Sequence, residues 1–128
     1  MSIRVVQLGT PRTLGEGLRL GTVRRPPRGV PKSAYASRDY YDVWLPDLAP
    51  SEALVRMARR VQHEREWQRF VKRYRAEMKR PPALRLIRLL AAFSHHVSFS
   101  VGCYCDDETR CHRSILKLLL EEYGARLE

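Results

Sequence analysis

The chain has 128 residues and a formal net charge of +10, from 24 Lys and Arg against 14 Asp and Glu. This length predicts one domain spanning 1–128, and 44% apolar residues suffice for a core, which excludes a wholly disordered chain. No apolar run approaches the roughly 18 residues that cross a bilayer, and residues 1–10 do not resemble a secretion signal. We therefore expect a basic cytoplasmic domain without a membrane partner.

The first part of the chain predicts extended structure. Short β-prone runs at Ile3–Leu8 and Leu18–Val23 indicate two strands separated by a turn rich in Gly and Pro. Prolines interrupt the cation-rich segment Arg24–Pro31, which is therefore a loop. The aromatic run Tyr40–Leu45 indicates a further extended segment.

The middle of the chain predicts helices. Ser51 is suited to be an N-cap, because its hydroxyl can accept a hydrogen bond from an amide of the first turn. From Trp67 onward, apolar residues recur at helical spacing as one stripe: Phe70, Val71, Tyr74 and Met78. A third helix is expected at Ala83–Phe93, after the Pro81–Pro82 break.

The last third predicts a strand, a loop and a helix. Val97–Cys103 alternates apolar and small polar residues, as a strand does. The helix that follows contains Ile115–Tyr123, and Gly124 is placed to end it. Together with the earlier runs, this order of elements indicates an α/β domain.

All three cysteines lie within residues 103–111, from the end of this predicted strand to the start of the helix that follows. Cys103 and Cys105 are two apart on an extended segment, so their side chains are expected on the same side. Cys111 lies near the helix start, beside His112 and Arg113, surroundings that lower a thiol pKa. The end of a strand that faces a helix N-terminus favours anions, so the amides of that turn and Arg113 are expected to hold an oxyanion such as phosphate.

Three interpretations of this cluster remain open. It is a pocket for an anion or nucleotide, with Cys111 and His112 as catalytic candidates. Alternatively, it is a structural zinc site formed by Cys103, Cys105, Cys111 and His112, although adjacent Cys and His ligands would have difficulty converging. In the third interpretation, the cysteines are small buried side chains and His112 caps backbone groups. The sequence indicates no other cofactor.

Several motifs resemble one family. Cys103–Cys105, followed by Cys111–Leu116, resembles the signature of the YeaO-like proteins, known as domain of unknown function 488. Glu16–Leu20, the Arg24–Gly29 loop and Trp44–Ser51 also agree, so the resemblance covers nearly the whole chain. Where many members read Asp-Arg-Leu-Trp-Pro-Arg-Gly, this chain reads Val-Arg-Arg-Pro-Pro-Arg-Gly. The resemblance implies a compact three-layer α/β/α, Rossmann-like domain with a small, mostly parallel sheet, and it implies no established reaction, substrate or cofactor.

The matched motifs are expected to converge on one cleft. Beside the cysteine turn, the candidate ligand-binding residues are Arg24, Arg28, Gly29, Trp44 and Ser51. The simpler alternatives are a solvated basic loop for the arginines, a core or pocket-wall position for the tryptophan and an N-cap for the serine. We expect a small phosphorylated or nucleotide-like ligand, and the sequence does not predict the oligomeric state.

The distribution of charge leaves a second function open. Residues 51–80 contain ten Lys and Arg against four Asp and Glu. A helix over Arg56–Arg80 would present a positive face to a nucleic acid, or would be an ordinary solvated face with Arg73 and Glu77 as an i,i+4 pair. No recognised nucleic-acid-binding motif accompanies this charge, and the aromatic residues of the segment lie on its apolar stripe. Nucleic acid therefore remains the alternative partner.

Overall fold

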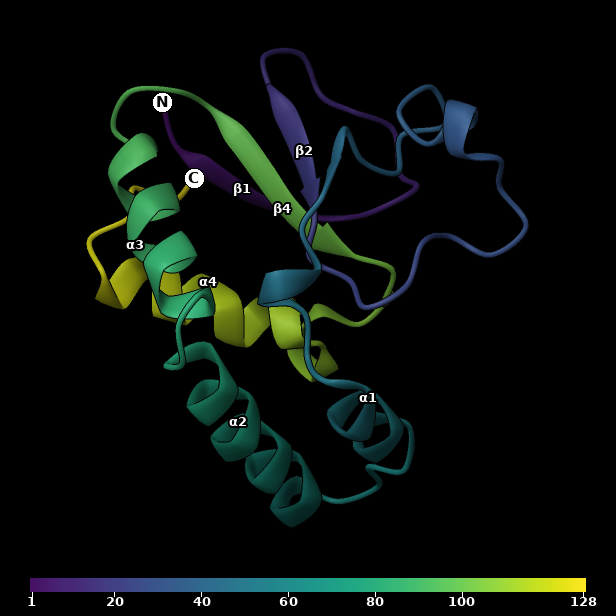
Figure 1. The fold of residues 1–128 in the computed structure, drawn as a ribbon, viewed down its shortest axis with the longest axis vertical. Coiled ribbons are helices and arrows are strands. Elements are labelled where there is room, and N and C mark those ends of the chain that lie inside the picture. Colours follow the sequence, from purple (N-terminus) through teal and green to yellow (C-terminus); the bar gives the residue numbers. More distant parts are fainter.

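The computed structural model describes residues 1–128 and contains one four-stranded sheet. All neighbouring strands are parallel, in the order β1-β4-β2-β3. The strands are β1 (Ile3–Gln7), β2 (Leu18–Gly21), β3 (Val43–Trp44) and β4 (Phe99–Cys103). This arrangement confirms the predicted α/β class and parallel sheet, and β4 occupies an interior position between β1 and β2 (Figure 1).

Four α-helices accompany the sheet (Figure 1): α1 (Glu52–Arg59), α2 (Glu64–Met78), α3 (Ala83–Phe93) and α4 (His112–Glu122). The predicted bounds of α3 are confirmed, and Ser51 is the N-cap of α1, where its hydroxyl accepts from the Leu54 amide. None of these helices is long and apolar enough to span a bilayer.

The basic stretch Arg56–Arg80 is two helices, so the continuous helical face expected there is wrong. Helix α1 ends at Arg59, and α2 begins at Glu64. The Glu66 carboxylate accepts a hydrogen bond from the Gln62 amide at 3.2 Å, which satisfies a backbone donor at the entrance to α2. The two helices pack against each other, and Arg56 of α1 and Arg69 of α2 line one hollow between them.

The larger core lies between one face of the sheet and the helices. Strand register aligns Phe99 with Ile3 and Val101 with Leu20, so these side chains share a face. They pack in one cluster with the apolar stripes of α2, α3 and α4, including Phe70, Tyr74, Ile87, Leu116, Leu119 and Leu120. Burial of this face fixes the position of α4 under the central strand.

The opposite face of the sheet is covered by the irregular chain between β2 and β3 and the loop before β2. The Tyr41 ring lies so close to the α-carbon of Gly21 that a β-carbon there would overlap it. The buried Arg19 side chain donates to the Glu16 carboxylate at 2.7 Å and to the carbonyl oxygens of Thr10 and Asp39. This layer contains one short 3-10 turn, Lys32–Ala34. Its contacts with the sheet hold the chain that follows β2 in place.

Candidate functional site

The candidate site lies where β4 ends and α4 begins. Cys103 is the last residue of β4, and Cys111 is the N-cap residue of α4. Between them, the Asp107 side chain accepts hydrogen bonds from the amide and hydroxyl of Thr109, which shapes a tight turn. This turn reverses the chain and brings Cys103 and Cys111, both almost completely buried, together.

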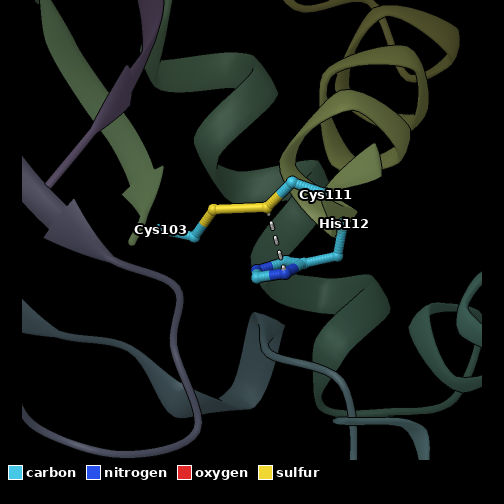
Figure 2. A group of neighbouring side chains, drawn as sticks. All are labelled: Cys103, Cys111 and His112. Atoms are coloured by element: carbon cyan, nitrogen blue, oxygen red, sulfur yellow. Dashed lines mark hydrogen bonds between the residues drawn. A yellow bond between two sulfur atoms is a disulfide. The ribbon is translucent and has the colours of Figure 1, made fainter. Parts of the chain in front are cut away.

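Cys103, Cys111 and His112 form one compact cluster (Figure 2). The two sulfur atoms are in bonding contact as a disulfide, and the two α-carbons are 7.8 Å apart. The Sγ atom of Cys111 lies 3.8 Å from Nδ1 of His112. The three potential ligand atoms all lie within 4.8 Å of one another.

The imidazole of His112 has a defined tautomer. Its Nε2 atom lies 2.6 Å from the carbonyl oxygen of Thr22, which only accepts, so Nε2 carries the proton. Nδ1 therefore presents a lone pair toward Cys111. Burial lowers the pKa of His112 to about 4, with a further contribution from the positive charge of Arg113, so the ring is neutral at pH 7.

The guanidinium group of Arg113 is buried beneath the turn. Its Nη1 atom lies 3.4 Å from the carbonyl oxygens of Val6 and Cys103 and 3.5 Å from the Cys103 sulfur. Arg113 thus holds the ends of β1 and β4 and places a positive charge beside a cysteine sulfur. Arg113 is therefore in direct contact with Cys103 of the cluster.

Cys105 does not join the cluster. Strand β4 ends at Cys103, so Cys105 lies beyond the regular strand, although it lines the same cavity as Cys103. The Cys105 thiol is exposed. A four-ligand site that includes Cys105 is therefore not formed, and the compact group contains Cys103, Cys111 and His112 alone.

A cavity of about 310 Å³, which we call the thiol cavity, opens beside the cluster. Its walls are mainly apolar, and the cluster residues form part of its lining. Arg59 from α1 and Arg110 from the turn contribute guanidinium groups. The full lining is Val23, Pro50, Val55, Ala58, Arg59, Phe70, Cys103, Tyr104, Cys105, Arg110, Cys111 and His112.

A second, larger depression of about 750 Å³ shares Arg59 and Tyr104 with this cavity. Arg25 and Arg28 also line it, and the Tyr104 hydroxyl donates to the Arg25 carbonyl oxygen at 2.8 Å. Arg25 pairs with a carboxylate of α1, whereas Arg28 and Arg59 make no side-chain hydrogen bond or ion pair. No acidic residue lines either hollow.

The chain also matches a known family. The profile described as "Active DUF488-N3 subclade" (DUF488-N3a) matches residues 3–124. The chain belongs to the DUF488 family. This confirms the resemblance carried by the cysteine motif and the arginine-proline loop, and the description assigns an activity to the subclade without naming a ligand or a reaction. No curated protein and no solved structure matches the chain.

Two of the other DUF488 motifs meet the cysteine turn. The Arg24 guanidinium donates to the carbonyl oxygens of Pro46, Ala49 and Pro50, which joins the loop after β2 to the segment before α1. Residues of both segments, Val23 and Pro50, line the thiol cavity. The arginine-proline loop and the Trp44–Ser51 segment therefore border the cysteine turn.

Other predicted residues of these DUF488 motifs lie elsewhere. Ser51 caps α1, and Gly29 is exposed with a φ of +75°, a backbone angle that favours glycine. Trp44 donates from Nε1 to the Val23 carbonyl oxygen at 2.7 Å and lines a separate hollow with Tyr35 and Tyr41. The structure therefore does not bring Ser51, Gly29 or Trp44 to the lining of the thiol cavity.

Sequence reasoning missed Arg59, Arg110 and Tyr104 as parts of the cavity lining. Arg59 is one of ten basic residues in its segment, and its neighbours give no signal that distinguishes it. Tyr104 stands between two cysteines of the motif, so its position was a usable signal. Arg110 lies over the Trp67 ring at 5.4 Å and pairs with Glu64 at 2.8 Å, contacts that only the fold creates.

Proposed function

We propose that the thiol cavity binds a small phosphorylated or nucleotide-like ligand and that Cys111 and His112 are its reactive centre. One observation carries this proposal: Arg59 lines both the thiol cavity beside the cysteines and the basic depression next to it. A ligand that spans them places its anionic group on the arginines and another part beside the cluster.

The charge of the two hollows favours an anionic ligand. Arg28 and Arg59 have no acidic partner, and no carboxylate lines the surrounding walls. A guanidinium group offers several donors in a planar arrangement that matches phosphate oxygens. The apolar residues Val23, Val55 and Phe70 in the adjoining wall suit a base or another flat apolar group of the same ligand.

The reduced form of the cluster suits thiol chemistry. The lone pair of His112 Nδ1 faces the Cys111 sulfur, so the neutral imidazole is oriented to accept a hydrogen bond from the Cys111 thiol. Cys111 is also the N-cap residue of α4, where the helix dipole stabilises a thiolate. Both effects increase the nucleophilicity of Cys111 beside a bound ligand.

The proposal is tested by ligand binding to the reduced protein. Inorganic phosphate and nucleoside monophosphates are titrated calorimetrically into wild type, Arg59→Ala and the matched control Arg85→Ala. Arg85 is an exposed arginine of α3 that lines none of these cavities. We expect Arg59→Ala to weaken binding at least about tenfold, since it removes a charge-assisted contact, and Arg85→Ala to leave it unchanged. Absence of binding, or equal losses in both variants, contradicts the proposal.

Nucleic acid is the second candidate, and a feature of α1 and α2 favours it. Arg56, Arg60 and Arg69, together with one acidic residue, Glu66, line a hollow of about 350 Å³ between these two helices. Three guanidinium groups around one hollow suit a phosphate of a nucleic-acid backbone. Binding to mixed DNA and RNA that falls steeply with salt and is weakened by Arg56→Ala supports this candidate. No mobility shift at low salt removes it.

A further inference from the structure

The proposed function gives Cys103 no role, although its sulfur is part of the same buried cluster. We propose that in the reduced protein Cys103, Cys111 and His112 bind one zinc ion through two thiolates and the Nδ1 atom of the imidazole. The inference rests on the proposed function of the cavity, because the ion would lie at its wall. Zinc would take up the Cys111 sulfur and the His112 Nδ1 atom that face each other in the metal-free protein, whereas the arginines that receive the anion are not ligands.

The positions of the donor atoms suit a common ion. All three lie within 4.8 Å of one another, and the Cys111 sulfur is 3.8 Å from Nδ1 of His112. The two sulfur atoms are joined as a disulfide, so they must separate on reduction before both can bind one ion. Zinc-sulfur and zinc-nitrogen bonds of about 2.3 and 2.0 Å at tetrahedral angles separate two ligand atoms by roughly 3.6 Å. The adjacent Cys and His side chains therefore already converge as zinc ligands do, which removes the objection that their sequence positions raise.

The backbone spacing of the two cysteines also suits two ligands of one ion. Their α-carbons are 7.8 Å apart, beyond the roughly 4.4–6.8 Å that most disulfides span. In the reduced protein, two thiolates on such a backbone can approach an ion placed between them. Cys103 comes from the end of β4 and Cys111 from the start of α4, so the site would join the two elements that define the turn.

The surrounding contacts are those that support metal ligands. His112 donates its Nε2 proton to the Thr22 carbonyl oxygen, as ligating histidines generally do through the nitrogen that is not bound to the metal. Arg113 approaches the Cys103 sulfur at 3.5 Å, where its charge favours the thiolate. A divalent ion and two thiolates are neutral together, so burial of these three groups costs little charge desolvation.

The cavity defines the kind of site. Three protein ligands leave a fourth position on tetrahedral zinc, and all three cluster residues line the 310 Å³ cavity. Structural zinc sites have four protein ligands, whereas catalytic sites leave one position for water or substrate. The fourth position here would face the ligand that Arg59 attracts, and it would accept water or an oxygen of that ligand.

The softness of the donors selects the metal. Two thiolates and one imidazole favour zinc over magnesium or calcium, which prefer oxygen ligands. The lining of the cavity contains no carboxylate that would serve a harder ion. Cobalt(II) occupies zinc sites with similar geometry and has visible absorption, so it serves as a spectroscopic probe.

The experiment begins with the full chain, reduced without oxygen and freed of metal by a chelator. Zinc is titrated in competition with a chromophoric chelator, and cobalt(II) is added to a second sample. We expect one ion per chain and a thiolate-to-cobalt charge-transfer band. Cys103→Ser and His112→Gln should each lower zinc affinity at least about a hundredfold, since even the loss of a second-shell partner costs 10- to 100-fold. The exposed His96 provides the matched control for the histidine, because His96→Gln should leave both readouts unchanged.

Two results overturn the inference. One is wild-type protein that binds no stoichiometric zinc and shows no charge-transfer band. The other is equal loss of binding in His112→Gln and His96→Gln. If Cys103→Ser fails to fold by circular dichroism, the cobalt spectrum of the wild type decides the question, because the band requires thiolate ligation.

A phosphate and nucleotide titration of the same metal-free protein separates this inference from the proposed function. Zinc binding without anion binding overturns the proposed function alone. Anion binding without zinc binding overturns the zinc site alone.

Discussion

The Nε2 atom of His112 lies 2.6 Å from the carbonyl oxygen of Thr22, and the two residues are 90 positions apart in the chain. This hydrogen bond joins the first turn of α4 to the chain just after β2. It leaves the Nδ1 lone pair directed at Cys111, whether the reduced thiol acts alone or with an ion. Thr22 also lies just before the loop that contains Arg24, Arg25 and Arg28. The orientation of the His112 ring and the position of the basic loop therefore depend on the same hydrogen bond.

Stability should decrease between pH 6.5 and pH 4 because of His112. Burial lowers the pKa of His112 from 6.5 to about 4 in the folded protein. The unfolded chain therefore binds a proton at a higher pH than the folded one, so the contribution to stability is complete above pH 6.5 and is lost as pH falls toward 4. The loss should approach roughly 3 kcal/mol.

Urea unfolding of the reduced protein at several pH values measures this dependence. His112→Gln should remove most of the slope in that range, and the exposed His96→Gln should retain it. A wild-type free energy of unfolding that is constant between pH 6.5 and 4 would contradict the assignment of a neutral buried ring.

Local sequence patterns predict the elements better than they predict the cavity. Ala83–Phe93 follows the Pro81–Pro82 pair and has an apolar pattern that indicates its length, and the stripe from Trp67 predicts the buried face of α2. Cys105 lies outside the compact group of Cys103, Cys111 and His112, because β4 ends at Cys103, where its pairing with β1 and β2 ends, and sequence alternation does not encode that end. Arg59 becomes part of the site only because α1 packs beside the cysteine turn, a tertiary contact that its sequence neighbours do not reveal.

Arg19 and Glu16 form a buried ion pair whose disruption should destabilise the fold. Arg19 donates from Nε and Nη2 to the two carboxylate oxygens, at 2.7 and 3.1 Å, and both side chains are nearly inaccessible. Arg19→Met leaves the Glu16 charge buried without its partner and should cost about 3–5 kcal/mol of unfolding free energy. Arg19→Met combined with Glu16→Gln should recover part of this loss in urea unfolding. A double variant that is less stable than the single one would contradict a role for the unpaired charge.

Arg24 and Arg28 belong to the same loop but should respond differently to substitution. Arg24 donates to three backbone carbonyl groups before α1, whereas Arg28 is exposed and makes no side-chain hydrogen bond. Arg24→Ala leaves these acceptors without a donor and should destabilise the protein by about 1–3 kcal/mol. Arg28→Ala should change stability by less than about 0.5 kcal/mol and should weaken phosphate binding. Thermal unfolding and calorimetric titration of both variants test the contrast, and equal destabilisation would show that the loop is not held through Arg24.

Cys111 should be the most reactive thiol of the reduced, metal-free protein, although Cys105 is the exposed one. Cys111 lies at the N-terminus of α4 with the imidazole of His112 at 3.8 Å, while burial and nearby carboxylates raise the pKa of the Cys105 thiol. Alkylation by iodoacetamide at pH 7, followed by peptide mass spectrometry, measures both rates in one sample. Cys111 should react faster than Cys105, nucleoside monophosphate should slow its reaction, and His112→Gln should reduce its rate about tenfold, the size of one lost hydrogen bond. Faster labelling of Cys105, without protection of Cys111 by the nucleotide, would remove Cys111 from the reactive centre.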